Sequence, residues 1–593
     1  MNESMNLRRL WLLLWVALLL VLIGSSLASY TQTAGGTVEI KDIRFIGTNG
    51  TEMSALLYIP SGATAETPAP GILAIHGYIN SRETQDGFAI EFARRGYVVL
   101  ALDQTGHGYS DPAAFANGFG GPDGLRYLRS LDIVDTNNIG LEGHSMGGWA
   151  SLAAAITYPE DYQAIVLAGS STGAPFAADG TPEWPRNLAL VFSAWDEFSD
   201  LMWGVPTGAE VVNSEKLKAV FSTTDPVVVG QLYGSIADGT ARQLYVPRGT
   251  HPNDHISTEA IGNAIEWMQQ TLTGGNGLAP SDQIWYWKEI GTFIAFIGLI
   301  LFLFPVGGLL LTLPYFNSLR APVPAAKGAT GMGWWVAALI ALVVPALTFF
   351  WLQNQGNQWI PASAFFPQTI TTGIMVWAVG NGLISLVLFL AWHFGMNNKS
   401  GATAEHYGLA WTGGFSLGKF FKAIVLAASV IGLAMVVVAV VDWVFKTDFR
   451  LWVLALKSMN FLQFHIMLAY LIPFAFFFVV SSVFLQGQMR QVKADGSPVG
   501  LGRAILVNAA LLALPIVGML LIQYIPLMGG SPLPLGESLL TIVGIQFVPL
   551  LIIVAAISTY FYRKTGTVWT GAFINALFIT WYIVAGQAIQ FPL

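Results

Sequence analysis

The sequence predicts two domains of different class. One is an α/β domain with a mostly parallel eight-stranded sheet flanked by helices, and the other is an all-α polytopic transmembrane domain. The 593 residues are 54% hydrophobic and only 11% charged, whereas soluble chains carry about 25% charged residues. Of the 35 acidic residues, 29 precede Trp285, while the 28 basic residues divide equally around it. Short apolar runs alternate with helical patterns before Trp285, and long apolar spans follow it.

The first 29 residues contain Arg8 and Arg9, followed by an apolar run that is long enough to cross a bilayer and ends in small residues. Two interpretations remain: an uncleaved signal anchor or a cleaved signal peptide. In either case the arginines are expected to stay in the cytoplasm, so the domain that follows is exported.

Residues 30–273 form the predicted α/β domain. Eight short runs read as strands, and most of them are continuously apolar, as in a parallel sheet that is covered on both faces. In order they are TVEIKDIRF, MSALLYI, GILAIH, YVVLALD, NIGLEG, QAIVLAG, LALVFSA and RQLYVP. The Gly-rich residues 274–284 are predicted to be a linker.

Residues 285–593 form the predicted membrane domain, which contains eight apolar spans. They centre on 290–313, 333–352, 369–393, 423–443, 461–484, 504–526, 538–560 and 567–590. If the α/β domain lies outside, the inner loops and tails hold twelve Lys or Arg residues, and the outer loops hold only Lys446, Arg450 and Lys457. This asymmetry predicts a multi-pass protein of the cytoplasmic membrane with an extracytoplasmic α/β domain. Polar residues within the spans, such as Gln546, are costly in lipid and are expected mainly to bond neighbouring helices.

A G-x-S-x-G motif lies at Gly143-His144-Ser145-Met146-Gly147. The pentapeptide alone is a weak signal in a chain with 63 glycines. Its context is more informative, because a predicted strand leads into it and a helix of small residues follows. The glycines permit a sharp strand-to-helix turn that exposes the Ser145 hydroxyl at a helix N-terminus. Ser145 is therefore a candidate nucleophile.

With this motif, residues 37–272 resemble the α/β-hydrolase superfamily. The segment AIHGY, after the third strand, matches the oxyanion loop of that family. The resemblance implies that the backbone N–H groups of Tyr78 (or Gly77) and Met146 bind a developing oxyanion. It also implies a serine hydrolase of esterase or lipase type, with peptidase or thioesterase activity as alternatives.

The family places its acid a few residues past the seventh strand and its base past the eighth. Asp196 fits the first position, and the adjacent Glu197 is expected to be a solvated loop acid. His251 and His255 both follow the eighth strand, and His251 fits better because His255 lies only two residues before Ser257, the predicted cap of the next helix. The order Ser145, Asp196, His251 is the order expected for this fold. His255 remains the alternative base.

A candidate substrate pocket would be lined by Trp195, Phe198 and Trp203, although these side chains fit equally well as loop anchors packed on the sheet. The implied mechanism passes through an acyl-enzyme and needs no cofactor or metal. The chain has no cysteine, which excludes a thiolate nucleophile and cysteine-ligated metals.

The expected function is that of a membrane-embedded serine hydrolase acting on carboxylic esters with lipid, acyl or peptide-like groups. Membrane lipids are its expected partners. Nucleic acid is not, because the soluble half is acidic. One alternative is a transporter or channel whose exported domain binds cargo, which would require a polar path through the spans. Another is a hydrolase-like scaffold without turnover. The substrate and the oligomeric state are not evident from the sequence.

Overall fold

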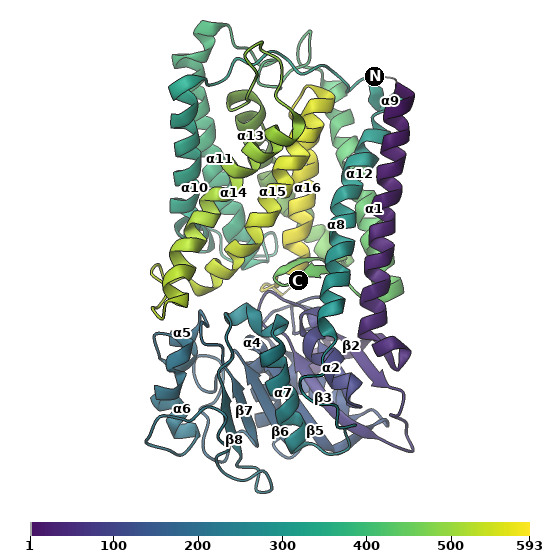
Figure 1. The fold of residues 1–593 in the computed structure, drawn as a ribbon, viewed down its shortest axis with the longest axis vertical. Coiled ribbons are helices and arrows are strands. Elements are labelled where there is room, and N and C mark those ends of the chain that lie inside the picture. Colours follow the sequence, from purple (N-terminus) through teal and green to yellow (C-terminus); the bar gives the residue numbers. More distant parts are fainter. Residues whose placement is uncertain (1–2, 593) are drawn as a thin grey trace.

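The α/β domain packs against one end of a bundle of long helices in a computed structural model that describes residues 3–592 (Figure 1). The chain begins with α1 (Glu3–Gln32), which runs down the side of the bundle towards the α/β domain. After the α/β domain, the chain returns to the bundle through α8 (Trp285–Leu310). Two helices therefore connect the two parts of the molecule.

An eight-stranded sheet forms the centre of the α/β domain, with the strand order β1-β2-β4-β3-β5-β6-β7-β8. Only the pairs β1–β2 and β2–β4 are antiparallel. The strands are β1 (Val38–Ile46), β2 (Glu52–Pro60), β3 (Ala69–Ile75), β4 (Val98–Leu102), β5 (Val134–His144), β6 (Ala164–Ala168), β7 (Leu188–Val191) and β8 (Arg242–Tyr245). The prediction of eight mostly parallel strands is confirmed.

Helices cover both faces of the sheet, which explains why its strands are apolar on both sides. One apolar core joins the sheet to α3 (Gly121–Arg129) and α4 (Met146–Thr157). The opposite core joins it to α2 (Asp86–Arg94) and α7 (Thr258–Thr271). Ser257 caps α7 as expected, because its hydroxyl accepts a hydrogen bond of 3.1 Å from the Ala260 N–H. The short helices α5 (Ser199–Trp203) and α6 (Glu215–Val220) lie between β7 and β8.

The bundle contains, besides α1 and α8, seven long helices and one short one. These are α9 (Pro314–Asn317), α10 (Gly331–Trp359), α11 (Thr369–Gly395), α12 (Leu417–Phe445), α13 (Phe461–Val483), α14 (Leu501–Met528), α15 (Ser538–Thr565) and α16 (Trp569–Gly586). Within residues 3–592, nine helices are long and apolar enough to cross a membrane, and eight of them follow the α/β domain as predicted. This is the organisation of a multi-pass membrane protein.

Glycines let α1 pack closely against α8. A Cβ on Gly24 would lie 2.4 Å from the Gly291 carbonyl oxygen, and one on Gly291 would lie 2.7 Å from the Ala28 nitrogen. Side chains larger than hydrogen would therefore separate the two helices. Close approach of this kind is a common basis of helix association in membranes.

Buried ion pairs join the α/β domain to the bundle. Lys457 Nζ lies 3.1 Å from a Glu83 carboxylate oxygen, and Lys288 pairs with Asp86. Arg450, on the short hairpin of β9 (Phe449–Leu451) and β10 (Leu454–Leu456), donates 3.0 Å to the Thr84 hydroxyl. Two of the three basic residues in the predicted outer loops thus bind the α/β domain and are buried there.

Candidate active site

Ser145 lies on the turn between β5 and α4 with a φ of 56°, a strained backbone conformation for a residue other than glycine. Its N–H donates 2.8 Å to the Ala168 carbonyl on β6. Two glycines make the turn possible: a Cβ on Gly143 would lie 2.2 Å from the Gly147 carbonyl oxygen, and one on Gly147 would lie 2.0 Å from the Ile75 carbonyl oxygen. The motif thus presents a half-buried serine at the carboxyl end of the sheet.

Asp196 and His251 come from the segments after β7 and β8 and meet at the same end of the sheet. His251 Nδ1 lies 2.8 Å from an Asp196 carboxylate oxygen. The other Asp196 oxygen accepts a hydrogen bond of 2.7 Å from the Phe198 N–H. Because a carboxylate accepts, His251 carries its proton on Nδ1 and keeps Nε2 as its basic nitrogen. His251 and Ser145 line one cavity.

Burial opposes charge on both members of this pair. It lowers the pKa of His251 to about 3, so the imidazole is neutral at neutral pH. It also raises the pKa of Asp196, against the effect of the Phe198 N–H, which favours the carboxylate. A neutral imidazole oriented by a carboxyl group is suited to accept a proton.

His255 is brought close to this pair but not into it. Its ring centroid lies 3.9 Å from that of His144, and His144 Nε2–H donates 3.0 Å to the His251 carbonyl. Within the described chain, neither His255 nitrogen has a hydrogen-bond partner. Burial lowers the pKa of His255. Thus, of the two candidate bases, the structure joins only His251 to the acid.

The predicted oxyanion donors lie beside Ser145. A Cβ on Gly77 would be 3.0 Å from the Ser145 Cβ, which places the AIHGY loop against the serine. Met146 is the first residue of α4, where backbone N–H groups have no acceptor within the helix. Tyr78, whose hydroxyl accepts 2.7 Å from Gln590 Nε2, lines the same cavity.

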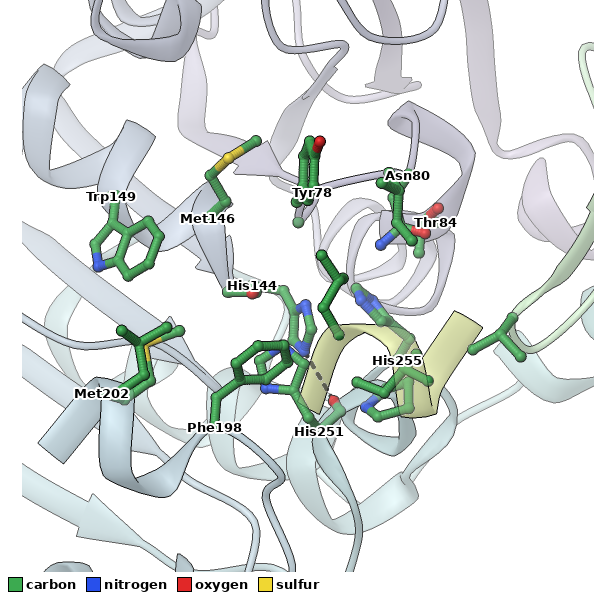
Figure 2. Close-up of a pocket in the computed structure, with 18 of the residues that line it drawn as sticks. Tyr78, Asn80, Thr84, His144, Met146, Trp149, Phe198, Met202, His251 and His255 are labelled. Carbon is green, nitrogen blue, oxygen red and sulfur yellow. Dashed lines mark hydrogen bonds between the residues drawn. The ribbon is translucent and has the colours of Figure 1, made fainter. Parts of the chain in front are cut away.

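The cavity has a volume of about 260 Å³ and lies where the α/β domain meets the bundle. Figure 2 shows the rings of His144, His251 and Phe198 close together on one side, with Tyr78 and Met146 across from them. From the bundle, the β9–β10 hairpin contributes Trp452, and α15 contributes Leu539, Ile542 and Gln546. Within residues 3–592, no group of His, Asp and Glu side chains is arranged to hold a metal ion.

The α/β domain is similar to known proteins. Residues 66–232 match the family model described as "Serine aminopeptidase, S33". The chain contains an α/β-hydrolase domain.

The similar proteins match only part of this chain. An uncharacterized protein of Mycobacterium tuberculosis is 35% identical over 221 residues, which cover 34% of this chain and 55% of that protein. A monoacylglycerol lipase of Mycolicibacterium smegmatis is 32% identical over 195 residues, covering 30% and 63%. The solved structure of the Pyrococcus furiosus esterase Pf2001 covers 41% of this chain and 94% of its own, with 17% identity and a TM-score of 0.29. The chain thus spans about half the length of the mycobacterial relative.

One expectation about the hydrolase domain is wrong, and one that was left open is narrowed. Glu197 is buried, not solvated: one carboxylate oxygen accepts 2.7 Å from the His251 N–H, and the other accepts 2.7 Å from the Tyr524 hydroxyl of α14. Burial, together with the nearby Asp196, raises the pKa of Glu197 to about 8. Among the three predicted pocket residues, only Phe198 lines the cavity.

Trp203 and Trp195 lie elsewhere in the hydrolase domain. Trp203 is 2% exposed and packs in the apolar core, where its indole N–H donates 3.0 Å to the Ser170 carbonyl. Trp195 bridges to Thr250, which ties the segment of the acid to that of the base. Trp203 is therefore a core anchor, one of the two readings that the sequence left equally open.

The contribution of the bundle to the wall of the cavity was not predicted from the sequence. Trp452, Leu539 and Ile542 resemble many other apolar residues of the spans, and nothing local marks them. Gln546 could be singled out from the sequence, because it is a polar side chain inside an apolar span. Its amide oxygen accepts 2.6 Å from the Tyr582 hydroxyl, so the expected bond between helices is present, and the residue also faces the cavity.

Proposed function

We propose that this protein is a membrane-embedded serine hydrolase that cleaves carboxylic esters through an acyl-enzyme. The observation that carries the proposal is the 2.8 Å contact between Asp196 and His251 in the cavity that also contains the strained Ser145 turn. A serine on such a strand-to-helix turn exposes its hydroxyl to the cavity, and the N-terminus of the helix that follows favours negative charge there.

In the proposed reaction, His251 Nε2 accepts the Ser145 proton while Ser145 Oγ bonds to the ester carbonyl carbon. The N–H groups of Met146 and of Tyr78 or Gly77 stabilise the oxyanion. The leaving alcohol takes the proton from His251 as the C–O bond breaks. Water, deprotonated by His251, then attacks the acyl-enzyme and releases a carboxylic acid and the free serine. Asp196 holds the imidazole tautomer and stabilises the imidazolium.

One relative and the lining of the cavity favour an ester over an amide substrate. The Mycolicibacterium protein carries the name monoacylglycerol lipase, whereas the family model is described by an aminopeptidase. The apolar walls of the cavity suit an acyl group, and no carboxylate in the cavity lining is positioned to bind the free amine of an aminopeptidase substrate. The transporter alternative would need a polar path, and the cavities among the long helices are lined mainly by apolar side chains.

A fluorophosphonate probe tests the mechanism. We expect it to label the purified protein, and we expect Ser145→Ala to remove both the labelling and the hydrolysis of ester substrates. Ser130→Ala, a change of an exposed serine in the same domain, is the matched control. An ester, thioester and aminopeptide panel then ranks the substrate classes. Full labelling of Ser145→Ala would disprove the assignment.

We further propose that the hydrolase domain lies outside the cytoplasmic membrane and that α1 is an uncleaved anchor. The basic residues of the loops far from the hydrolase domain and the close packing of α1 on α8 support this. Since the chain has no cysteine, single cysteines report the topology directly. In intact cells a membrane-impermeant maleimide should label Ser130→Cys but not Asp495→Cys, which lies in a loop at the opposite end. The reverse pattern would place the hydrolase domain in the cytoplasm.

A further inference from the structure

Three cavities follow one another along α15, beginning at the candidate active site. The cavity at Ser145 ends on this helix at Gln546. A cavity of about 30 Å³ is lined by α15 from Val543 to Val554 and shares Gln546 with the first cavity. A third cavity, of about 450 Å³, begins at Leu551. Each cavity therefore shares wall residues with the next, and together they lead from the serine into the bundle.

Neighbouring cavities share only a few lining side chains. Gln546, held by Tyr582, separates the first cavity from the second. Trp377, Phe477 and Leu551 separate the second from the third. A continuous channel therefore requires rotamer changes at these shared side chains.

The largest of these three cavities is apolar and reaches the outer surface of the bundle. It lies among α10, α11, α13 and α14, and one of its few polar groups, Asn381, is already bonded to Trp377 and Thr348. Leu388 and Met396 on its rim are 41% and 58% exposed. Because these helices are long and apolar enough to cross a membrane, that surface faces lipid tails.

The length of the path matches one acyl chain. Twelve residues of α15 separate Leu539, at the cavity of Ser145, from Leu551, at the largest cavity. At 1.5 Å per residue this is about 18 Å. A hydrocarbon core of about 30 Å contains two leaflets, so one leaflet measures about 15 Å. A chain that reaches from the membrane surface to the bilayer centre therefore fits the path.

We propose that these cavities form a channel that binds the long acyl chain of a membrane lipid ester, with the ester carbonyl at Ser145. The proposal rests on the proposed hydrolase activity and specifies its substrate class. The bundle then has a role beyond anchoring, because its interior binds the acyl tail while the hydrolase domain cleaves the ester bond. Only the ester group has to leave the bilayer, because the acyl tail passes from the apolar interior of the membrane to an apolar channel in the protein.

Two fluorophosphonate probes test the channel in the full-length protein. One carries a short alkyl chain, and the other carries a 16-carbon chain with a photoreactive diazirine at its end. Ser145 Oγ displaces fluoride from phosphorus in each probe, and its proton leaves through His251. After illumination, we expect the long probe to crosslink to α10, α11 or α13. Crosslinks to Phe115, Trp149 or Phe176, on the hydrolase wall of the first cavity, would overturn the channel.

A plug variant provides the second readout. Ala378 is buried in the wall of the small cavity, and Ala378→Phe should fill it. Because a tail that cannot enter the channel holds the phosphorus of the long probe away from Ser145, the plug should slow labelling by the long probe at least about tenfold. Labelling by the short probe should not change. Leu339→Phe, on an exposed face of α10, is the matched control. Equal labelling of Ala378→Phe and wild type by the long probe would contradict the proposal.

The outcomes separate the two proposals. If the short probe fails to label the wild type, the serine hydrolase assignment fails. If the short probe labels but the long tail crosslinks outside the channel, only the channel fails. If Ala378→Phe does not react with either probe, Ala341→Trp, in the half-buried wall of the largest cavity, decides by the same comparison.

Discussion

The two walls of the candidate active-site cavity differ in chemistry. The wall from the hydrolase domain carries Ser145, His251, His144 and His255, whereas the wall from the bundle carries Trp452, Leu539, Ile542 and a single amide, Gln546. The groups able to move protons all lie on the first wall. The second wall offers apolar surface. In the proposed mechanism, reactivity and substrate retention are therefore divided between the two domains.

The bundle also holds the loops of the reactive wall. Tyr524 bonds to Glu197, next to Asp196. The Trp452 indole N–H donates 2.9 Å to the carbonyl of Pro252, the residue after His251. Gln590 bonds to Tyr78 in the oxyanion loop. The segments of the candidate acid, the candidate base and the candidate oxyanion loop therefore each have a partner in the bundle.

The neighbouring acids Asp196 and Glu197 provide the sharpest test of which groups on the reactive wall act in the reaction. Asp196→Asn removes the carboxylate that orients His251, and kcat/KM should fall by about 10⁴-fold. Glu197→Gln should change it by no more than about threefold at pH 7, because a carboxyl with a pKa of about 8 is already neutral there. Steady-state kinetics on one ester, with both variants purified in the same way, decides between them. An equal loss in both variants would contradict the division of roles.

The two histidines provide the next test. His251→Ala removes the base and should lower kcat/KM by about 10⁴-fold. His255→Ala removes a ring without hydrogen-bond partners and should cost less than about tenfold, mainly through lost packing. Fluorophosphonate labelling rates give an independent measurement of the same ranking. Full turnover in His251→Ala with loss in His255→Ala would reverse the assignment.

What the sequence predicted well depends on local pattern. The strands, the spans, the helix cap at Ser257 and the position of Ser145 all follow from periodicity, capping and turn chemistry within a few residues. The burial of Glu197 could not be predicted, because its cover comes from α14, more than 300 residues later. The sequence left Trp203 open between pocket and core for a similar reason. The direction in which α5 presents each aromatic side chain depends on how that short helix docks on the core.

The acid limb of the pH profile tests the electrostatics of the reactive wall. An imidazole with the ordinary pKa of 6.5 would lose about 30-fold of its base form between pH 7 and pH 5. Burial lowers the pKa of His251 to about 3, so kcat/KM at pH 5 should stay within about threefold of its value at pH 7. An acid limb with a midpoint above pH 6 would show that the imidazole is solvated in the free enzyme.

The alkaline limb tests Glu197. As the pH rises through about 8, Glu197 gains a negative charge inside the site. That charge opposes the oxyanion, so kcat/KM should fall, and Glu197→Gln should remove this inflection. Glu142, whose pKa burial also raises to about 8, has no place in the cavity lining. Glu142→Gln is therefore the control, and its profile should keep the inflection.

The smallest expected effect tests whether the bundle positions the reactive wall. Tyr524→Phe removes one hydrogen bond from α14 to Glu197, and a bond worth about 1 kcal/mol corresponds to about fivefold in kcat/KM. Tyr315→Phe, an exposed tyrosine at the far end of the bundle, should have no effect. If the bond acts through Glu197, adding Glu197→Gln should give a double variant whose loss differs from the product of the two single losses. Multiplicative losses would mean that Tyr524 and Glu197 act independently, and the bundle would then contribute surface to the cavity without positioning the catalytic loop.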